Sequence, residues 1–417
     1  WPHHHSRLKE AILVTPKLKI SPFPFSDSTR EQGGNSTAKA EVLTLPGNLP
    51  TPADTAEAAA QSAPNVQPIK ATPASASNLS ATSHDLDAAR SLMPLSFPNP
   101  PSKEDGIPLT TIANIDHLLK MYGITVRYNV IKKKLEVSWH GQSGTTDNRD
   151  NLALTTILSL VTLNRMSTGS VPAILETLAD RNPHNPVADW ITSKPWDEVD
   201  RLEAFYETLV ERENYPKPLK EVLMHRWLIS GVAAAMMPQG FYGRGILTLQ
   251  GPQSIGKTSW IRAMIPDPIL REQILKLDHH LDAGNKDSQI TAICHWMVEI
   301  GELDSSLKKD VARLKGFITS DRDKLRKPYG RTNSEYQRRT VFCASVNDHA
   351  FLVDPTGNTR FWTIPVTKID YQHTIDMQQL WAQIAVDFRN DEPWWLDRHE
   401  EKCLEDCNKE HRAVSAI

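Results

Sequence analysis

Three short apolar runs in the second half of the chain predict buried strands. They cover residues 245–250, 295–299 and 339–347. Continuous apolar runs of this length are typical of strands that are buried on both faces. Helical sequence between such strands favours a parallel arrangement. The pattern therefore predicts an α/β core with a parallel sheet over residues 241–370.

A different pattern precedes this core. Apolar residues within 112–120 recur at the spacing of one helix face, residues 124–130 alternate as in a strand, and residues 135–139 form a return strand after a lysine-rich turn. Residues 150–235 are mostly helical in pattern, with breaks at prolines. We therefore expect an accessory domain, mixed but mainly helical, over residues 107–240.

The two ends of the chain differ from both regions. Residues 1–105 contain about half of the 29 prolines, mixed with Ala, Ser and Thr. Such a composition buries too little apolar surface to offset the entropy of ordering the backbone. We predict a disordered linker here, and we expect it to tether an upstream domain. A helical stripe over residues 379–388 begins a C-terminal helical segment that we place at residues 371–417.

Composition and charge narrow the classes of function only slightly. The formal net charge is -3 and the sequence pI is about 6.6, so only local clusters can indicate a polyanionic partner. Two of the four cysteines lie in apolar runs, which favours a reducing compartment over a disulfide scaffold. No apolar run is long enough to cross a bilayer. The sequence predicts a cytoplasmic protein without a membrane span.

The loop after the first core strand carries the strongest chemical signal. It matches Gly-x-x-x-x-Gly-Lys-Ser/Thr between a predicted strand and a predicted helix. The glycines let backbone N–H groups face phosphate oxygens, Lys257 adds positive charge, and the Thr258 hydroxyl can ligate Mg²⁺. The alternative is a glycine-containing turn with a surface lysine. The residues expected to contact ATP are Gly251, Pro252, Gln253, Ser254, Ile255, Gly256, Lys257, Thr258 and Ser259.

Polar residues follow the next two core strands. Glu299 ends the second strand and is the expected acid on the Mg²⁺ side, with Thr258 as the other metal ligand. Glu302 is the candidate catalytic base, and the alternative is a solvated or salt-bridged residue beyond the strand. Asn347 ends the third strand, where it is expected to hold a water near the γ-phosphate. The alternative for Asn347 is an Asx turn.

One arginine late in the core is a further catalytic candidate. A turn presents Arg360 directly before another apolar strand. We expect Arg360 to act as a sensor or as a finger that reaches the γ-phosphate of a neighbouring subunit. The alternative is an intrachain salt bridge.

A basic segment lies between the second and third core strands. Residues 308–339 contain eleven Lys and Arg but only four Asp and Glu, although the chain as a whole is net acidic. Basic residues interleaved with tyrosine suit a loop that follows a nucleic-acid backbone and stacks on its bases. The alternative is a solvated charged face. The residues expected to bind DNA, preferably single-stranded, are Lys324, Arg326, Lys327, Tyr329 and Arg331.

The order of these motifs resembles that of superfamily III helicases. The strings at residues 296–302, 327–331 and 354–362 are more closely similar to the virulence-associated protein E family. This resemblance implies a P-loop ATPase of the AAA+-like type that uses ATP and Mg²⁺. It also implies a homo-oligomeric ring, often a hexamer, in the replication of a prophage or other mobile element. Relatives are often fused to or partnered with a primase.

These observations predict an ATP-dependent DNA helicase or translocase. The alternative is an ATP-gated DNA-binding switch or assembly protein that does not unwind DNA. A small-molecule kinase is a third possibility, but it leaves the basic segment unexplained. Many superfamily III helicases have two adjacent acids at the strand end, whereas Ile300 follows Glu299 here. The identity of the base is therefore open.

Overall fold

The computed structural model describes residues 86–143, 145–239, 241–301, 303–325, 334–352 and 358–412. All of them belong to one unit, Leu79–Ile417. Of the predicted disordered linker, residues 1–85 lie outside the described residues and residues 86–105 lie within them. In the described part of the chain, no helix is both long and apolar enough to cross a membrane.

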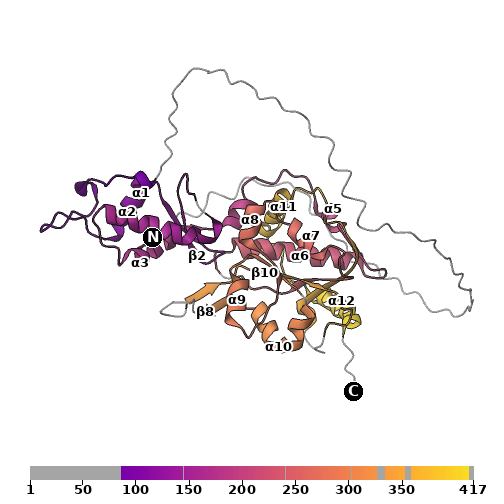
Figure 1. Cartoon of the computed structure of the whole chain (residues 1–417). Helices are drawn as coiled ribbons and strands as arrows, with labels where there is room; N and C mark the ends of the chain where they lie inside the picture. The colour runs from indigo at the N-terminus through magenta and orange to yellow at the C-terminus, as the bar shows by residue number, and fades with distance from the viewer. Residues whose placement is uncertain are drawn as a thin grey trace, which may run out of the picture. The chain divides into compact units, whose positions relative to one another are not determined.

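A six-stranded sheet lies at the centre of residues 209–369 (Figure 1). Its five strands from β11 to β6 are parallel, and β4 is antiparallel to β11 at one edge. The three strands expected from the apolar runs are present. The sheet as a whole is mixed, whereas the sequence predicts a parallel sheet. In spatial order the strands are β4 (Leu209–Glu211), β11 (Phe361–Ile369), β5 (Ile246–Gln250), β10 (Val341–Val346), β7 (Met297–Ile300) and β6 (Leu275–His279).

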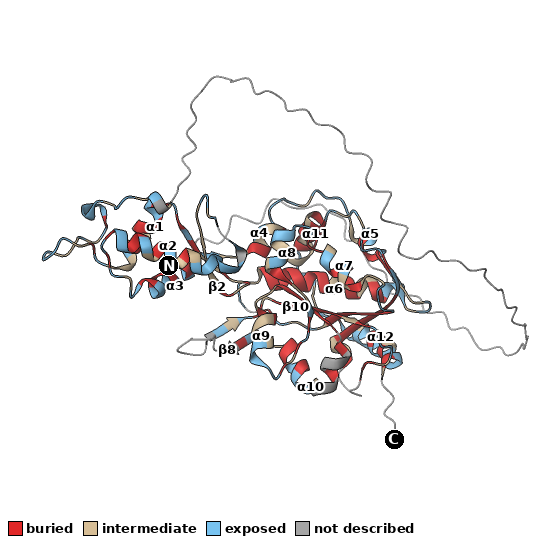
Figure 2. Cartoon of the chain, in the orientation of Figure 1, coloured by how far each residue is buried: buried red, intermediate tan, exposed pale blue. Residues whose placement is uncertain are grey.

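Alternate side chains of the parallel strands enter two apolar clusters, one on each face of the sheet. Leu247 and Leu249 of β5 join the first cluster, whereas Ile246 joins the second. The helices of the first face are α6 (Lys217–Met236), α7 (Lys257–Ala263), α8 (Pro268–Ile274) and α11 (Met377–Arg389). Those of the second face are α9 (Lys286–Ile293) and α10 (Leu303–Ile318). Figure 2 shows these helices on opposite sides of the buried strands.

Helix α6 is buried on almost all sides because its C-terminal half is apolar around its whole circumference. The indole N–H of Trp227 donates to the carbonyl of Phe342 at 2.8 Å, which fixes α6 against β10. The indole N–H of Trp296 donates to the carbonyl of Gly231, also at 2.8 Å. A Cβ atom at Gly231 would lie 3.0 Å from the Trp381 ring, so this glycine allows α11 to approach α6 closely.

A third apolar cluster organises the accessory elements. The predicted helix and hairpin are present as α1 (Ile112–Met121), β1 (Thr125–Asn129) and β2 (Lys134–Ser138). The short strand β3 (Pro183–His184) pairs with β1 in parallel. The other α-helices of the described residues are α2 (Arg149–Leu163), α3 (Val171–Asp180), α4 (Pro186–Ile191), α5 (Leu202–Tyr206) and α12 (Arg398–Asn408).

Residues 86–105 pack against this cluster, although their composition predicts disorder. Phe97 is buried in it. The backbone N–H of Asn99 donates to Asn114 Oδ1 at 2.8 Å, and the N–H of Leu92 donates to Asn164 Oδ1 at 2.7 Å. A proline-rich composition gives no sign of this order, because one aromatic side chain and a few amide contacts are enough to hold the segment.

The tip of the β1–β2 hairpin carries a buried lysine. Asn129 Oδ1 accepts hydrogen bonds from the N–H groups of Ile131 and Lys132, which shapes the turn. Lys133 follows with a left-handed φ of 54° and is only 3% exposed. Its ammonium donates to the carbonyl of Gln337 at 3.1 Å. Burial lowers the pKa of Lys133 to about 8.

We expect Lys133→Met to stabilise the fold at neutral pH. Between pH 8 and the ordinary lysine pKa near 10.5, the unfolded chain holds a proton that the folded chain has lost, so wild-type stability rises with pH in this window. At pH 7, burial of the charged ammonium lowers the free energy of unfolding by on the order of 3 kcal/mol. An uncharged methionine with the same backbone conformation avoids this cost. Urea unfolding at pH 7 and pH 9.5 measures the difference.

The half-exposed Lys134, which pairs with Asp150, provides the control as Lys134→Met. The gain in the free energy of unfolding caused by Lys133→Met should shrink as the pH rises. The control substitution should show no such trend. An advantage that is equal at both pH values would contradict burial of the charge.

Candidate nucleotide site at the carboxyl edge of the sheet

The predicted phosphate loop joins β5 to α7. Gly256 begins α7 with a φ of 101°, and Ser254 has a φ of 66°. Glycine adopts such a conformation without steric cost. At Gly251 a Cβ atom would lie 2.5 Å from the carbonyl oxygen of Val366, so β11 approaches the loop backbone closely. These two glycines permit a tight turn between β5 and α7, close to β11.

Lys257 lies inside this turn, with only 7% of its surface exposed. Its ammonium donates to the carbonyls of Gly251 and Pro252, both at 2.8 Å, and to Asn347 Oδ1 at 2.9 Å. Burial lowers the pKa of Lys257, and the nearby Glu299 carboxylate opposes this shift. The contact with Asn347 joins the loop to the end of β10.

Thr258 and Glu299 form the second contact between predicted residues. The Thr258 hydroxyl donates to Glu299 Oε1 at 2.7 Å. Glu299 is fully buried, and its Oε2 accepts from the backbone N–H of Asp278 at 3.3 Å. A carboxylate beside a hydroxyl is an oxygen donor set of the kind that Mg²⁺ prefers. These residues therefore fit a magnesium ion.

The sheet topology explains why these residues meet. Strands β5, β10 and β7 are adjacent and parallel, so their carboxyl ends lie at one edge of the sheet. Lys257 and Thr258 follow β5, Asn347 follows β10, and Glu299 lies near the end of β7. Four of the predicted catalytic and metal-binding side chains are thus brought together.

Asp278 is a neighbour of this site that the sequence analysis missed. It lies in β6, next to β7, with a φ of 49°. A Cβ atom at Gly301 would lie 2.0 Å from Asp278 Oδ1, so the carboxylate packs directly on the β7 backbone. The sequence signal for it is an acid that directly follows the apolar residues Leu275 and Leu277 of a short alternating stretch. Glu302, the predicted base, lies outside the described residues.

Arg360 lies at the opposite edge of the sheet. It directly precedes β11, whose first residue, Phe361, pairs with Ile246 at the start of β5. The phosphate loop follows Gln250 at the other end of β5, about 13 Å away at roughly 3.3 Å per residue. Arg360 therefore does not lie with the other predicted catalytic residues. Its predicted alternative is not observed either, since Arg360 has no ion-pair partner among the described residues.

Arg360 lines a cavity of about 290 Å³ at this amino edge. Arg244 shares the cavity, and its guanidinium lies 4.6 Å from the ring centroid of the exposed Tyr242. Trp395 is 44% exposed there. This edge therefore holds an exposed arginine, a half-buried arginine and an exposed aromatic ring.

The basic segment contains a β-hairpin formed by β8 (Arg322–Leu325) and β9 (Ser334–Gln337). Lys324 lies in β8, and its side chain is not among those described. The other four predicted DNA-binding residues, Arg326, Lys327, Tyr329 and Arg331, lie outside the described residues. The role of the hairpin connection thus stays a prediction.

Two arginines at the base of this hairpin have structural partners. Arg338 is buried, donates to both carboxylate oxygens of Asp323 at 2.8 and 2.6 Å, and stacks on the Phe317 ring at 4.4 Å. Arg339 donates to the carbonyls of Ala235 and Met237, both at 3.1 Å. Both arginines belong to the basic excess of residues 308–339. Both guanidinium groups form hydrogen bonds within the protein, so they attach the hairpin to the core and are not free to bind DNA.

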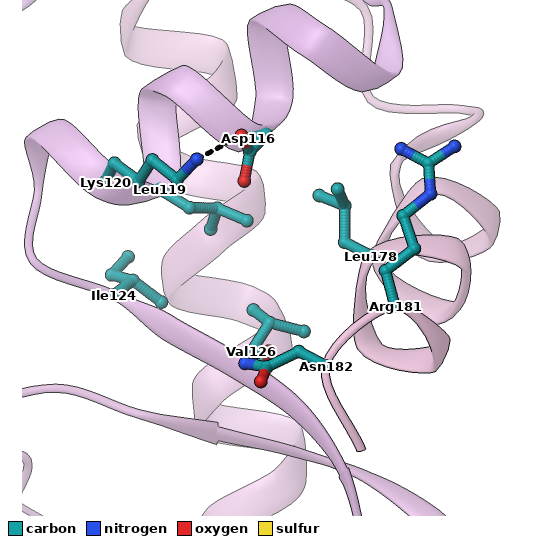
Figure 3. A pocket seen from close by; sticks show the side chains of 8 residues that line it. All are labelled: Asp116, Leu119, Lys120, Ile124, Val126, Leu178, Arg181 and Asn182. Atoms are coloured by element: carbon teal, nitrogen blue, oxygen red, sulfur yellow. Dashed lines mark hydrogen bonds and ion pairs between the residues drawn. The ribbon is translucent and has the colours of Figure 1, made fainter. Parts of the chain in front are cut away.

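The accessory elements enclose a separate cavity of about 260 Å³ (Figure 3). Leu119, Ile124 and Val126 form its apolar wall, and the Lys120–Asp116 ion pair at 2.6 Å lies at one side. Arg181 projects from the end of α3 on the other side. None of the predicted site residues lies here.

The fold and the site together define a class of protein. It is a mixed α/β protein in which a glycine-rich loop forms hydrogen bonds with a buried acid and an asparagine at the carboxyl ends of the parallel strands. The family model of the virulence-associated protein E-like domain matches residues 191–413. The chain belongs to the virulence-associated protein E-like family. The match includes both edges of the sheet and the hairpin.

Two solved structures with a similar chain are both of the NrS-1 C-terminal region. The apo structure of residues 305–718 is 12% identical with a TM-score of 0.41, and covers 72% of this chain and 75% of that chain. The A form apo structure is 14% identical with a TM-score of 0.43, and covers 73% and 75%. None of the curated proteins compared with this chain matches it.

Proposed function

We propose that this protein is an ATP-dependent DNA helicase or translocase with a P-loop ATPase core of the AAA+-like type. The observation that carries the proposal is the pair of contacts Lys257–Asn347 and Thr258–Glu299. A glycine-rich loop, a lysine, a hydroxyl, a buried acid and an asparagine are the parts that phosphoryl transfer to water requires. Membership of the virulence-associated protein E-like family supports a role in replication.

The residues at the carboxyl edge have distinct proposed roles. Backbone N–H groups of residues 253–259 and the Lys257 ammonium bind the phosphates, and the lysine exchanges its carbonyl acceptors for phosphate oxygens. Asn347 orients the attacking water. Thr258 and Glu299 would hold a Mg²⁺ ion, which would neutralise negative charge on the phosphates. Glu302 is the proposed base that accepts the water proton.

The position of Arg360 supports action on a neighbouring subunit. An arginine at the amino edge of its own sheet is too far from its own phosphate loop for direct contact, but it is partly exposed in the cavity that Arg244 also lines. We propose a homo-oligomeric ring, a hexamer in keeping with the family resemblance, in which Arg360 completes the site of the next subunit. The setting is replication of a prophage or mobile element in the bacterial cytoplasm, with a primase as a partner or fused domain.

The hairpin connection is proposed to bind single-stranded DNA. Neutralising Lys324, Arg326, Lys327 and Arg331 together should weaken DNA binding about equally for all sequences. Removal of each phosphate contact should reduce the slope of log K against log salt by roughly 0.7, and Tyr329→Ala should cost a further ~1–3 kcal/mol if the ring stacks on a base. Fluorescence anisotropy with single-stranded DNA at several salt concentrations measures both effects.

The control neutralises Arg398 and Lys402 of α12, which are exposed and distant from the hairpin in sequence. ATP binding should be unchanged in both variants. If the hairpin variant binds DNA with the wild-type affinity and salt slope, its charges form only a solvated face.

The competing function is an ATP-gated DNA-binding switch. Unwinding of a forked duplex separates the two functions, because a switch binds the fork but does not displace a strand during ATP hydrolysis. We expect strand displacement with ATP and Mg²⁺, and none with a non-hydrolysable ATP analogue. Nucleotide-dependent DNA binding without displacement would support the switch.

A further inference from the structure

The order of the strands indicates how a nucleotide would be oriented in the candidate site. Asn347 directly follows β10 and Glu299 lies in β7, and both strands are on one side of the loop-bearing strand β5. Their contacts with Lys257 and Thr258 put the γ-phosphate and metal end of a bound nucleotide on that side. The nucleoside must therefore leave on the other side of β5, toward β11 and β4.

A tyrosine lies on that side. Strand β11 continues past the end of β5, and the segment between β11 and α11, residues 370–376, lies beside the phosphate loop. A Cβ atom at Gly256 would lie 2.3 Å from Tyr371 Cδ1 and 2.7 Å from its Cε1. The Tyr371 ring therefore lies against the last glycine of the loop. It remains 41% exposed, so one part of the ring is open to a ligand.

The segment that carries Tyr371 is held in place. The backbone N–H of Asp370 donates to the carbonyl of Thr208 at 2.8 Å. The Thr208 hydroxyl in turn accepts from the Trp260 indole of α7, also at 2.8 Å. The ring of Phe205 stacks on Trp260 with centroids 5.3 Å apart and meets the edge of His373 at 6.2 Å. Residues 370–376 are thereby tied to the helix that follows the phosphate loop.

His373 shows that this segment contains unused polar atoms. Both ring nitrogens are buried, and neither has a hydrogen-bond partner among the described residues. Burial also lowers the pKa of His373, which favours a neutral ring with one donor and one acceptor. Buried polar groups without partners are uncommon. These nitrogens are closed to solvent, so the exposed ring of the segment is that of Tyr371.

We propose that Tyr371 is the nucleoside-binding residue of this site, with its ring stacked on the base or ribose of a nucleoside triphosphate. This inference rests on the proposed function, because it assigns the other end of the same ligand. Stacking suits this position because the ring is rigid, partly exposed and adjacent to the loop that holds the phosphates.

Binding of ATP and of inorganic tripolyphosphate, each with Mg²⁺, tests the proposal. Tripolyphosphate contacts the phosphate loop but has no nucleoside. Tyr371→Ala should weaken ATP binding about 5- to 100-fold, as expected for loss of one stacked ring, and leave tripolyphosphate binding within about twofold of wild type. Tyr371→Phe should bind ATP almost as wild type. Tyr242→Ala, at a tyrosine 40% exposed on the opposite edge, is the matched control and should change neither.

Two results would overturn the assignment. If Tyr371→Ala binds ATP as wild type does, the ring contributes nothing to nucleoside binding. If it weakens ATP and tripolyphosphate equally, Tyr371 only supports the loop at Gly256. Failure of the proposed function looks different, because the wild-type protein would then bind neither ligand.

Discussion

Lys257→Ala should reduce ATP hydrolysis by about 10²–10³-fold and leave the fold intact. The Lys257 ammonium is the buried charge of the phosphate loop, and its loss removes a charge-assisted contact to the transferring phosphoryl group. Burial of that charge is costly, so its removal should not lower the free energy of unfolding greatly. Steady-state phosphate release and thermal unfolding measure the two effects separately.

The control is Lys368→Ala, an exposed lysine of β11. It should retain wild-type turnover. Near-normal hydrolysis by a folded Lys257→Ala protein would show that the phosphate site has been assigned to the wrong loop.

Arg360→Ala should bind ATP with unchanged affinity but hydrolyse it about 10³-fold more slowly. Binding is spared because Arg360 lies at the amino edge of its own sheet, away from the loop that holds the phosphates. Hydrolysis is lost because the arginine stabilises charge at the site of the adjacent subunit in the transition state. Equilibrium ATP binding and single-turnover hydrolysis separate the two quantities, with the exposed Arg398→Ala as control.

Mixed assemblies give the sharper form of this prediction. A subunit with Arg360→Ala keeps its phosphate loop, and a subunit with Lys257→Ala keeps its arginine. An interface that combines the intact parts of both should hydrolyse ATP, so mixing two inactive variants should restore partial activity. If no mixture gains activity, Arg360 acts within its own chain or not at all.

The sequence predicts that Lys257, Thr258, Glu299 and Asn347 lie together, because their positions follow from local patterns. The loop pattern contains Lys257 and Thr258 in consecutive positions, and each later strand delivers one polar residue at its end. Parallel strands in one sheet bring their carboxyl ends together whatever their exact order. The contacts of Asn347 and Glu299 with the loop follow from that rule.

Residues that depend on tertiary contacts could not be predicted in the same way. Tyr371 follows β11, which continues beyond the end of its neighbour β5. The position of the ring depends on how far β11 continues, and no local sequence pattern predicts this. Arg338 is one basic residue among many in the sequence, and only its bidentate contact with Asp323 shows that it anchors the hairpin. Its burial beside Phe317 is likewise a property of the fold.

Strand β4 shows the same limit at the level of the fold. Its three residues are too short a run to indicate a strand, yet they pair with the end of β11 and make the sheet mixed. The pairing follows from the continuation of β11 beyond its parallel neighbour, which leaves backbone groups to be satisfied.

The proposed ATPase function is tested by the steady-state ATPase rate of the wild-type protein with and without single-stranded DNA, at saturating ATP and Mg²⁺. We expect hydrolysis that single-stranded DNA stimulates severalfold, and a rate about 10²–10³-fold lower with Lys257→Ala under either condition. Absence of ATP hydrolysis by an assembled wild-type protein, with or without DNA, would contradict it.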